Sequence, residues 1–146
     1  MNYKVIKAIG EQLDWHIAKY FKKSEDIKKH SDDRIGFFAV TEDKNILGYL
    51  VISIKEVTPP FCIDWFIQDT RVLPEFRRQG IATAILGKTI KYAKEANVNH
   101  LIGMSNKEDA NLFWYKNDFG FYFMGKDADG RGVYGITRCI VKISNH

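Results

Sequence analysis

The sequence is poor in the features that mark secreted and membrane proteins. Its two cysteines, Cys62 and Cys139, lie far apart among strand-forming residues. Two are too few for a disulfide framework or a cysteine-based metal site, so we expect two buried thiols. No apolar run approaches the ~20 residues that cross a bilayer. Residues 1–7 alternate like a strand and lack the apolar core of a secretion signal, so we expect a cytoplasmic protein with no membrane segment.

The histidines also lack the spacing that metal ligands need. His16, His30, His100 and His146 form no pair four residues apart and have no neighbouring cysteine. We therefore expect no structural metal.

Charge of one sign is only slightly in excess. The chain carries 22 basic and 18 acidic residues, a formal net charge of +4 and a pI near 9.0. The lysines between positions 19 and 29 are interrupted by Glu25 and Asp26, which is typical of a solvated helix face. No aromatic-interleaved basic motif accompanies them, so the charge favours an anionic small ligand over a nucleic acid.

The hydrophobic periodicity predicts one mixed domain over residues 1–146. At this length and with 45% hydrophobic residues, the chain can bury a single core. Period-two patterns predict strands at 3–9, 35–41, 46–55, 63–72, 100–104, 119–124 and 133–143. Helical patterns cover 11–21, 24–33, 81–96 and a segment that begins after Ser105. The order βα(α)βββαβαββ predicts an α/β fold in which helices cover both faces of one sheet.

Two local signals refine this prediction. Gly48, inside a strand pattern, indicates a bulge or a close backbone contact. The tandem Pro59-Pro60 must lie in a loop, because proline cannot donate within a paired strand.

The turn from Val72 to Thr83 is the most informative segment of the chain. It joins the strand at 63–72 to a helix through Pro74, two arginines and Gly80. The first N–H groups of a helix have no intrahelical partners and lie at the positive end of the helix dipole, so they favour a phosphate. Glycine permits a close backbone approach, and the arginines add positive charge. The turn is therefore predicted to bind an anion.

This segment resembles the acyl-CoA signature of the GCN5-related N-acetyltransferase (GNAT) superfamily. That signature is Val-x-Pro-x-x-Arg, followed by Arg/Gln-x-x-Gly-x-Gly/Ala. Val72, Pro74 and Arg77 match its first half, and Arg77, Gly80 and Ala82 match its second half. The alternative is an ordinary strand-to-helix turn that matches by chance. The strand before the motif and the helix after it favour the family signature over that alternative. The element order also resembles the family's, so the resemblance spans nearly the whole chain.

The resemblance implies a mostly antiparallel sheet that is splayed at its central strand, with the acyl-CoA in the gap. The backbone groups of Arg71, Val72 and Leu73 would pair with the pantetheine arm. The pyrophosphate would bind the N–H groups from Arg78 to Thr83, aided by the charge of Arg77. By the same resemblance, Asn111 would approach the cofactor. The cofactor-binding set is thus Arg71, Val72, Leu73, Arg77, Arg78, Gln79, Gly80, Ile81, Ala82, Thr83 and Asn111.

For catalysis, the family pattern Asn-x(5–6)-Phe-Tyr-x-x-x-Gly-Phe points to Tyr115 as the general acid. A phenol is protonated at neutral pH and can donate to a leaving thiolate. Four residues separate Tyr115 from Gly120 where three are usual in the family, and a packing role is the alternative. The carbonyl would be polarised by a backbone N–H near Val72.

The general base is less well defined by sequence. The family's strand glutamate would fall at Phe66, which takes no proton. Asp64 shares a strand face with Phe66 by the period of two, and is the candidate base through a water. Glu56 is a second candidate, and Asp69 falls on the opposite face by the same count. Proximity supplies much of the rate in such reactions, so water alone is a further alternative.

The resemblance thus predicts an enzyme that moves the acetyl group of acetyl-CoA to a primary amine of a small molecule or peptide, by direct transfer in a ternary complex. The absence of cysteine from both motifs argues against an acyl-enzyme. The alternatives are a CoA-binding module without transferase activity and a small basic RNA-associated protein. The sequence does not name the acceptor, and its long terminal strand offers an edge for pairing in a homodimer.

Overall fold

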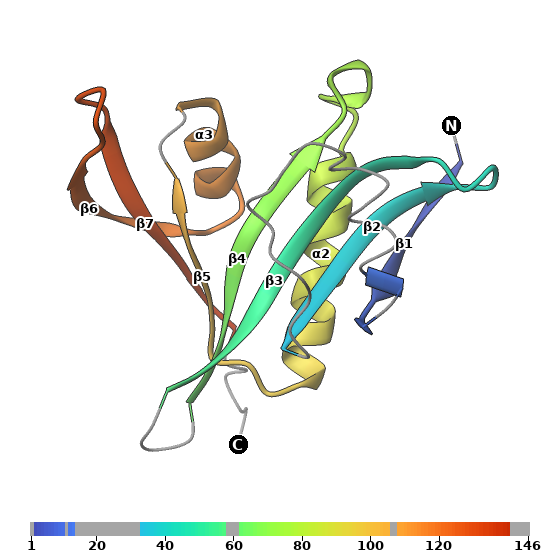
Figure 1. The fold of residues 1–146 in the computed structure, drawn as a ribbon, viewed down its shortest axis with the longest axis horizontal. Coiled ribbons are helices and arrows are strands. Elements are labelled where there is room, and N and C mark those ends of the chain that lie inside the picture. Colours follow the sequence, from blue (N-terminus) through green and yellow to red (C-terminus); the bar gives the residue numbers. More distant parts are fainter. Residues whose placement is uncertain (1, 11, 14–32, 58–61, 106–107, 141–146) are drawn as a thin grey trace.

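The computed structural model describes residues 2–10, 12–13, 33–57, 62–105 and 108–140. Seven strands form one sheet in the order β1-β2-β3-β4-β5-β7-β6 (Figure 1). Neighbouring strands are antiparallel except for β4 and β5, which are parallel. The strands are β1 (Tyr3–Ala8), β2 (Arg34–Thr41), β3 (Ile46–Val57), β4 (Cys62–Val72), β5 (His100–Ser105), β6 (Gly120–Lys126) and β7 (Gly132–Cys139).

Two helices and one 3-10 turn complete the described part. These are η1 (Pro74–Phe76), α2 (Ile81–Glu95) and α3 (Glu108–Lys116). The predicted strands and the two later helices are confirmed, with ends shifted by a few residues. The predicted helices at 11–21 and 24–33, the Pro59-Pro60 loop and the end of the last predicted strand lie almost wholly outside the described residues. Among the described residues, no helix is both long and apolar enough to cross a membrane.

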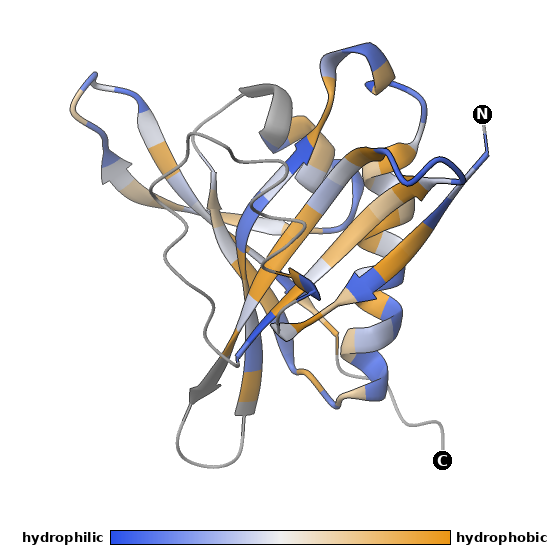
Figure 2. Cartoon of the chain, turned by 45° about the vertical axis from the view of Figure 1, so that its right-hand side comes forward, coloured by the Kyte–Doolittle hydropathy of each residue, from blue (hydrophilic) through white to orange (hydrophobic). Residues whose placement is uncertain are grey.

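The two faces of the sheet bury different residues because neighbouring side chains on a strand point to opposite sides. On one face, here called the helix face, Phe37, Leu50 and Trp65 pack with Ile85 of α2 and Trp114 of α3. On the other, here called the open face, a second core is formed by Ala8, Leu13, Phe38, Val40, Ile46, Tyr49 and Val51. α2 buries Ile81, Ile85, Leu86 and Ala93 in the core of the helix face, and apolar and hydrophilic residues alternate along it (Figure 2).

The prediction that Cys139 is buried is wrong. Cys139 is an exposed free thiol at the last residue of β7. It pairs with His100 of β5, and strand alternation places both on the open face, away from α2 and α3. The side chain of Cys62 lies outside the described residues.

Two β-bulges change the alternation of the central strands. The register between β2 and β3 shifts next to Gly48, as the sequence predicted. Between β3 and β4, Val51 pairs with Asp69 while Ile52 pairs with Ile67, so Gln68 is the extra residue. Paired residues share a face, which places Asp69 on the open face with Tyr49 and Val51. The two-residue count that separated Asp64 from Asp69 is therefore wrong, because the bulge inverts it.

β4 and β5 pair over a short stretch and then separate. Their register runs from Asp64 with His100 to Phe66 with Ile102 and ends there. β5 continues along β7 as far as Ser105, so it leaves β4 and follows β7. Figure 1 shows the two strands together at the lower end of the sheet and apart at the upper end. The open edge of β4 past Phe66 is here called the splay.

Glycine substitutions test the packing of β3 against β4. A Cβ on Gly48 would lie 2.8 Å from the Arg71 carbonyl oxygen, whereas one on Gly87 in α2 would meet nothing within 4 Å. We expect Gly48→Ala to lower the free energy of unfolding by about 1–3 kcal/mol, since backbone atoms must move. The matched Gly87→Ala should raise it by about 0.5–1 kcal/mol through helix propensity. Urea unfolding of both variants measures this, and an unchanged Gly48→Ala protein would contradict the close contact.

Candidate functional site

The splay exposes backbone groups of β4 that no strand satisfies. The Leu73 N–H donates to the Leu47 carbonyl oxygen at 2.9 Å, so Leu73 faces β3. Backbone hydrogen-bonding direction alternates along a strand. The Arg71 N–H therefore also points to β3, while the N–H groups of Thr70 and Val72 point into the splay. Of the three residues that the sequence predicted to pair with a ligand, Val72 alone offers its N–H to this opening, and Thr70 joins it.

The start of α2 lies at the upper end of the splay. Gly80 is its N-cap, with φ 77°, and no side chain caps the helix. The first helical bond runs from the Ala84 N–H to the Gly80 carbonyl oxygen, so the N–H groups of Ile81, Ala82 and Thr83 precede the helical ladder. A Cβ on Gly80 would meet nothing within 4 Å, so the space before the helix is open. The structure thus provides a row of N–H donors at a helix N-terminus that begins at an uncrowded glycine.

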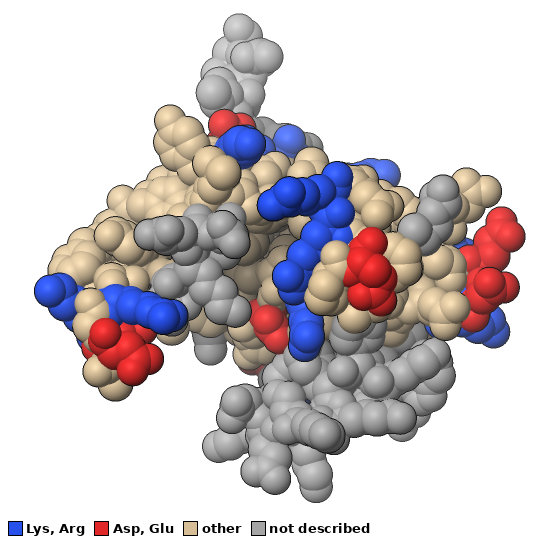
Figure 3. All heavy atoms as spheres, turned by 90° about the horizontal axis from the view of Figure 1, so that it is seen from above, with Lys and Arg blue, Asp and Glu red and all other residues tan. Residues whose placement is uncertain are grey.

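The basic residues of the turn surround this row. Arg77 and Arg78 are exposed, and Arg78 takes a left-handed conformation with φ 63°, which costs a non-glycine residue about 1–2 kcal/mol. The Arg77 Nε donates to the Val72 carbonyl oxygen at 3.0 Å, which fixes the guanidinium beside the splay. The Gln79 amide donates to the Glu75 carbonyl oxygen at 3.3 Å. Seen from this end, a band of Lys and Arg side chains borders a hollow (Figure 3).

Among the residues that the structure describes, three buried oxygen atoms near the splay have no hydrogen-bond partner. They are Thr70 Oγ1 on β4, Ser105 Oγ on β5 and Asn111 Oδ1 on α3. Ser105 is only 7% exposed. Thr70 is paired with Leu50, and Ser105 lies four residues after Leu101 on β5. Since Leu50 and Leu101 belong to the core of the helix face, Thr70 and Ser105 lie on that face too. Orphaned buried polar groups are rare in folded proteins, and three of them around one opening indicate a ligand that supplies the missing bonds.

Of these three residues, the sequence identified only Asn111. The exposed backbone of Thr70 depends on the bulge at Gln68, which has no sequence signal. Ser105 stands three residues before Glu108, a pattern that predicts a helix start and not a ligand contact. The structure makes Ser105 the last residue of β5.

Tyr115 lies on the same side of α3 as Asn111, because residues four apart on a helix are neighbours. Its side chain is 70% exposed. The additional residue between Tyr115 and Gly120 falls after the helix ends, in a turn where Asp118 has φ 68°. The longer spacing therefore does not rotate Tyr115 on the helix. Its role as an acid stays a prediction.

The carboxylates of β4 have different partners. Asp64 Oδ1 lies 3.2 Å from His100 Nδ1, at the closed end where β4 and β5 pair. Asp69 Oδ2 accepts a hydrogen bond of 2.9 Å from the Tyr49 hydroxyl, at the level where the strands separate. The sequence did not single out either His100 or Tyr49. Asp64 as base stays a prediction, as does Glu56, whose side chain lies outside the described residues.

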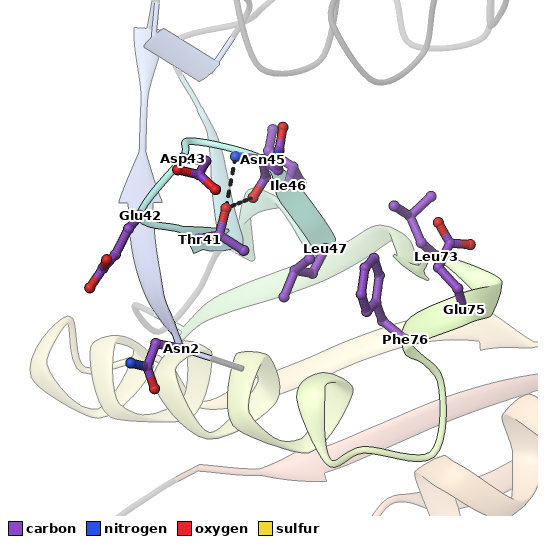
Figure 4. Close-up of a pocket in the computed structure, with 10 residues that line it drawn as sticks. All are labelled: Asn2, Thr41, Glu42, Asp43, Asn45, Ile46, Leu47, Leu73, Glu75 and Phe76. Carbon is purple, nitrogen blue, oxygen red and sulfur yellow. Dashed lines mark hydrogen bonds between the residues drawn. The ribbon is translucent and has the colours of Figure 1, made fainter.

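A separate pocket lies on the other side of the β4–η1 connection (Figure 4). Its floor includes Leu47, Leu73 and Phe76, and its rim carries Glu42, Asp43 and Glu75. None of the described residues that line it is basic, so it would repel the phosphate that the start of α2 favours. Among the described residues, no group of three or more His, Cys, Asp or Glu side chains could hold a metal ion.

Comparisons with known proteins agree with this geometry. The model of the acetyltransferase (GNAT) family matches residues 7–121. No curated protein matches the chain in sequence.

Solved structures share the fold at low identity. The ribosomal-protein-S18-alanine N-acetyltransferase from Escherichia coli is 14% identical with a TM-score of 0.69, over 97% of both chains. An IAA acetyltransferase from Bacillus cereus is 14% identical with a TM-score of 0.72, over 94% of this chain and 99% of that one. Arabidopsis thaliana NAA60, solved with acetyl-CoA, is 13% identical with a TM-score of 0.71, over 94% of this chain and 99% of that one. The family match spans most of the chain, and the chain belongs to the GNAT family of acetyltransferases.

Proposed function

We propose that this acetyltransferase moves the acetyl group of acetyl-CoA to a primary amine by direct transfer in a ternary complex. The observation that carries the proposal is the splay: unpaired β4 backbone runs from the start of α2 to three orphaned buried oxygens. The relatives support the two substrates. NAA60 was solved with acetyl-CoA, and the Escherichia coli enzyme is named for an alanine of ribosomal protein S18.

The residues of the splay fit acetyl-CoA in chemical type. The N–H groups from Arg78 to Thr83, with the guanidinium groups of Arg77 and Arg78, suit a pyrophosphate. The Thr70 and Val72 backbone suits the amides of a pantetheine arm, as an added strand would. The orphaned atoms of Ser105 and Asn111 suit polar groups further along the same ligand.

Bound acetyl-CoA supplies a thioester whose carbonyl carbon accepts the amine. In this proposal a backbone N–H of β4 near Val72 donates to the carbonyl oxygen, where negative charge develops. The Tyr115 hydroxyl donates a proton to the leaving sulfur. Cys139, exposed on the open face near the closed end of the splay, is badly placed to carry the acetyl group, which favours direct transfer over an acyl-enzyme.

A CoA-binding module without transferase activity is the alternative. Phe66 favours it, because it stands where the family has a strand glutamate, on the open face of β4. Acetylation measurements separate the two functions.

We expect the purified protein to acetylate members of a panel of polyamines, amino sugars, arylalkylamines and peptide N-termini, as seen by mass spectrometry with acetyl-CoA.

The double substitution Arg78→Glu with Gly80→Glu places two carboxylates at the start of α2 and should abolish CoA binding in calorimetry. The matched control Arg131→Glu, in the exposed turn between β6 and β7, should bind CoA normally. Undiminished CoA binding by the double variant would contradict the assignment of the site.

Tyr115→Phe tests the proposed acid. Because the side chain is 70% exposed, removing its hydroxyl should leave the free energy of unfolding within about 0.5 kcal/mol of the parent value. We expect kcat to fall by about 10²–10⁴-fold, with little change in the affinity for acetyl-CoA. Steady-state thiol release measures kcat, and a variant as fast as the parent at every pH would show that another group protonates the sulfur.

A further inference from the structure

We propose that the acceptor is a small primary amine that carries an apolar, preferably aromatic, group. Its ammonium binds Asp69 on the open face of the sheet, and its apolar part lies on Tyr122 and Met104. This inference rests on the proposed function and names the substrate class of the same site.

The direction of approach follows from where the donor groups lie. Thr70 Oγ1 and Ser105 Oγ lie on the helix face of the sheet. Asn111 is on α3, which packs against the same face. A donor held by these groups fills the splay from the side of the helices. The attacking amine must reach the carbonyl carbon from a side that the donor leaves free. The open face is the side opposite the donor groups, and Met104 and Tyr122 are exposed on it.

Asp69 is the carboxylate that the fold aims at this side of the splay. The bulge at Gln68 turns Asp69 to the open face, at the level where β4 has lost its pairing with β5. Tyr49, which is fully buried, donates its hydroxyl to Asp69 Oδ2 at 2.9 Å and fixes the carboxylate. Within the described part of the chain, no lysine or arginine forms an ion pair with Asp69. A partly exposed carboxylate whose hydrogen bond comes from a neutral donor can bind a cation.

Asp64 is less suited to this role. Its Oδ1 faces His100 Nδ1, and it is in the closed part of the sheet, two pairs before the end of the β4–β5 register. An amine at Asp64 would therefore lie further from the splay than one at Asp69.

The opposite wall of the splay is apolar. Met104, Gly135 and Tyr122 are aligned across β5, β7 and β6, and the register places all three on the open face. A Cβ on Gly135 would lie 2.0 Å from Tyr122 Cζ, so the missing side chain lets the tyrosine ring lie over β7. Met104 is 58% exposed and Tyr122 is 53% exposed. An aromatic ring and a thioether on one exposed surface offer contact to an apolar or aromatic group.

The two walls face each other across the splay. The last pair of β4 and β5 is Phe66 with Ile102, so two residues further on Met104 lies at the level of Gln68 and Asp69. The site therefore presents a negative charge on one side and an apolar surface on the other. That combination complements a primary ammonium attached to an apolar body.

The proton balance is complete with these groups. Asp69 takes one proton from the ammonium, and the neutral nitrogen forms the new C–N bond as the C–S bond breaks. The sulfur leaves with a proton from Tyr115, the second proton of the nitrogen returns to the Tyr115 phenolate through solvent, and Asp69 releases its proton to solvent. The net reaction converts an ammonium and a thioester into an amide, a thiol and one released proton.

Two acceptors of different polarity test the apolar wall. We expect Tyr122→Ser to lower kcat/KM for phenethylamine by about 10–100-fold and to leave kcat/KM for ethanolamine within about twofold. The matched control is Phe123→Ser, since Phe123 contacts Tyr134 and lies on the helix face of the same strand. Its ratio of phenethylamine to ethanolamine activity should stay at the parent value. Equal ratios in both variants would overturn the apolar wall.

Asp69→Asn tests the ammonium site. The amide oxygen still accepts the Tyr49 hydrogen bond, so the fold is preserved while the charge is lost. We expect kcat/KM to fall about 10²–10⁴-fold for both amines, with the CoA dissociation constant within about twofold of the parent. Tyr49→Phe removes the hydroxyl that positions Asp69. We expect it to lower kcat/KM by about 10-fold, mainly through a higher KM for the amine. Retained turnover in Asp69→Asn would overturn the assignment.

The failure of this inference differs from the failure of the proposed function. A parent protein that binds no CoA contradicts the donor site. If the parent binds CoA but acetylates no amine, calorimetric binding of phenethylamine to the CoA complex decides the inference. Binding that is lost in Asp69→Asn supports it, and binding that is absent from the parent or unchanged in the variant overturns it.

Discussion

The separation of β4 from β5 is the constraint on which the rest of the structure depends. β4 is hydrogen-bonded to β3 along its length, yet it pairs with β5 only from Asp64 to Phe66. Beyond that point β5 follows β7 and leaves one edge of β4 without a strand. Unpaired backbone in the middle of a sheet is costly unless something binds it. The sheet therefore has the form of a site that a ligand completes.

The bulge at Gln68 gives the two sides of the splay different chemistry. It turns Thr70 toward the helix face, where its hydroxyl is buried without a partner, and Asp69 toward the open face, where Tyr49 holds it. One extra residue in one strand thus directs a neutral polar group toward the proposed donor side and a carboxylate toward the proposed acceptor side. Two reactants that enter from opposite sides can be bound at once, which is what direct transfer requires.

The sequence predicted the part of the site that depends on local chain geometry. The turn from Val72 to Thr83 was recognisable because its glycine, its arginines and the helix after it act within a few residues of one another. The central sheet and the helix at 81–96 followed from periodicity, and the later helix from its capping pattern at Ser105 and Glu108. Asn111 was placed by resemblance. Its side-chain oxygen is buried without a hydrogen-bond partner among the described residues, and its contact with the cofactor stays a prediction.

The parts that could not be predicted depend on how distant strands pair. The face of Asp69 is inverted by a bulge that the alternation of residues in β4 does not reveal. The Leu73 N–H donates to the Leu47 carbonyl oxygen, and Cys139 is exposed. Both facts follow from the register between strands that are far apart in sequence. The contact between Tyr122 and Gly135 is of the same kind, since each residue is ordinary in its own segment.

The central claim is that acyl-CoA completes the unpaired edge of β4. Residue-resolved amide hydrogen exchange with and without CoA tests this directly, because each N–H reports its own hydrogen bond. The N–H groups of Thr70 and Val72 should exchange more slowly when CoA is bound, while those of Arg71 and Leu73, which face β3, should change little. Exchange at Thr70 and Val72 that stays the same under saturating CoA would contradict the account.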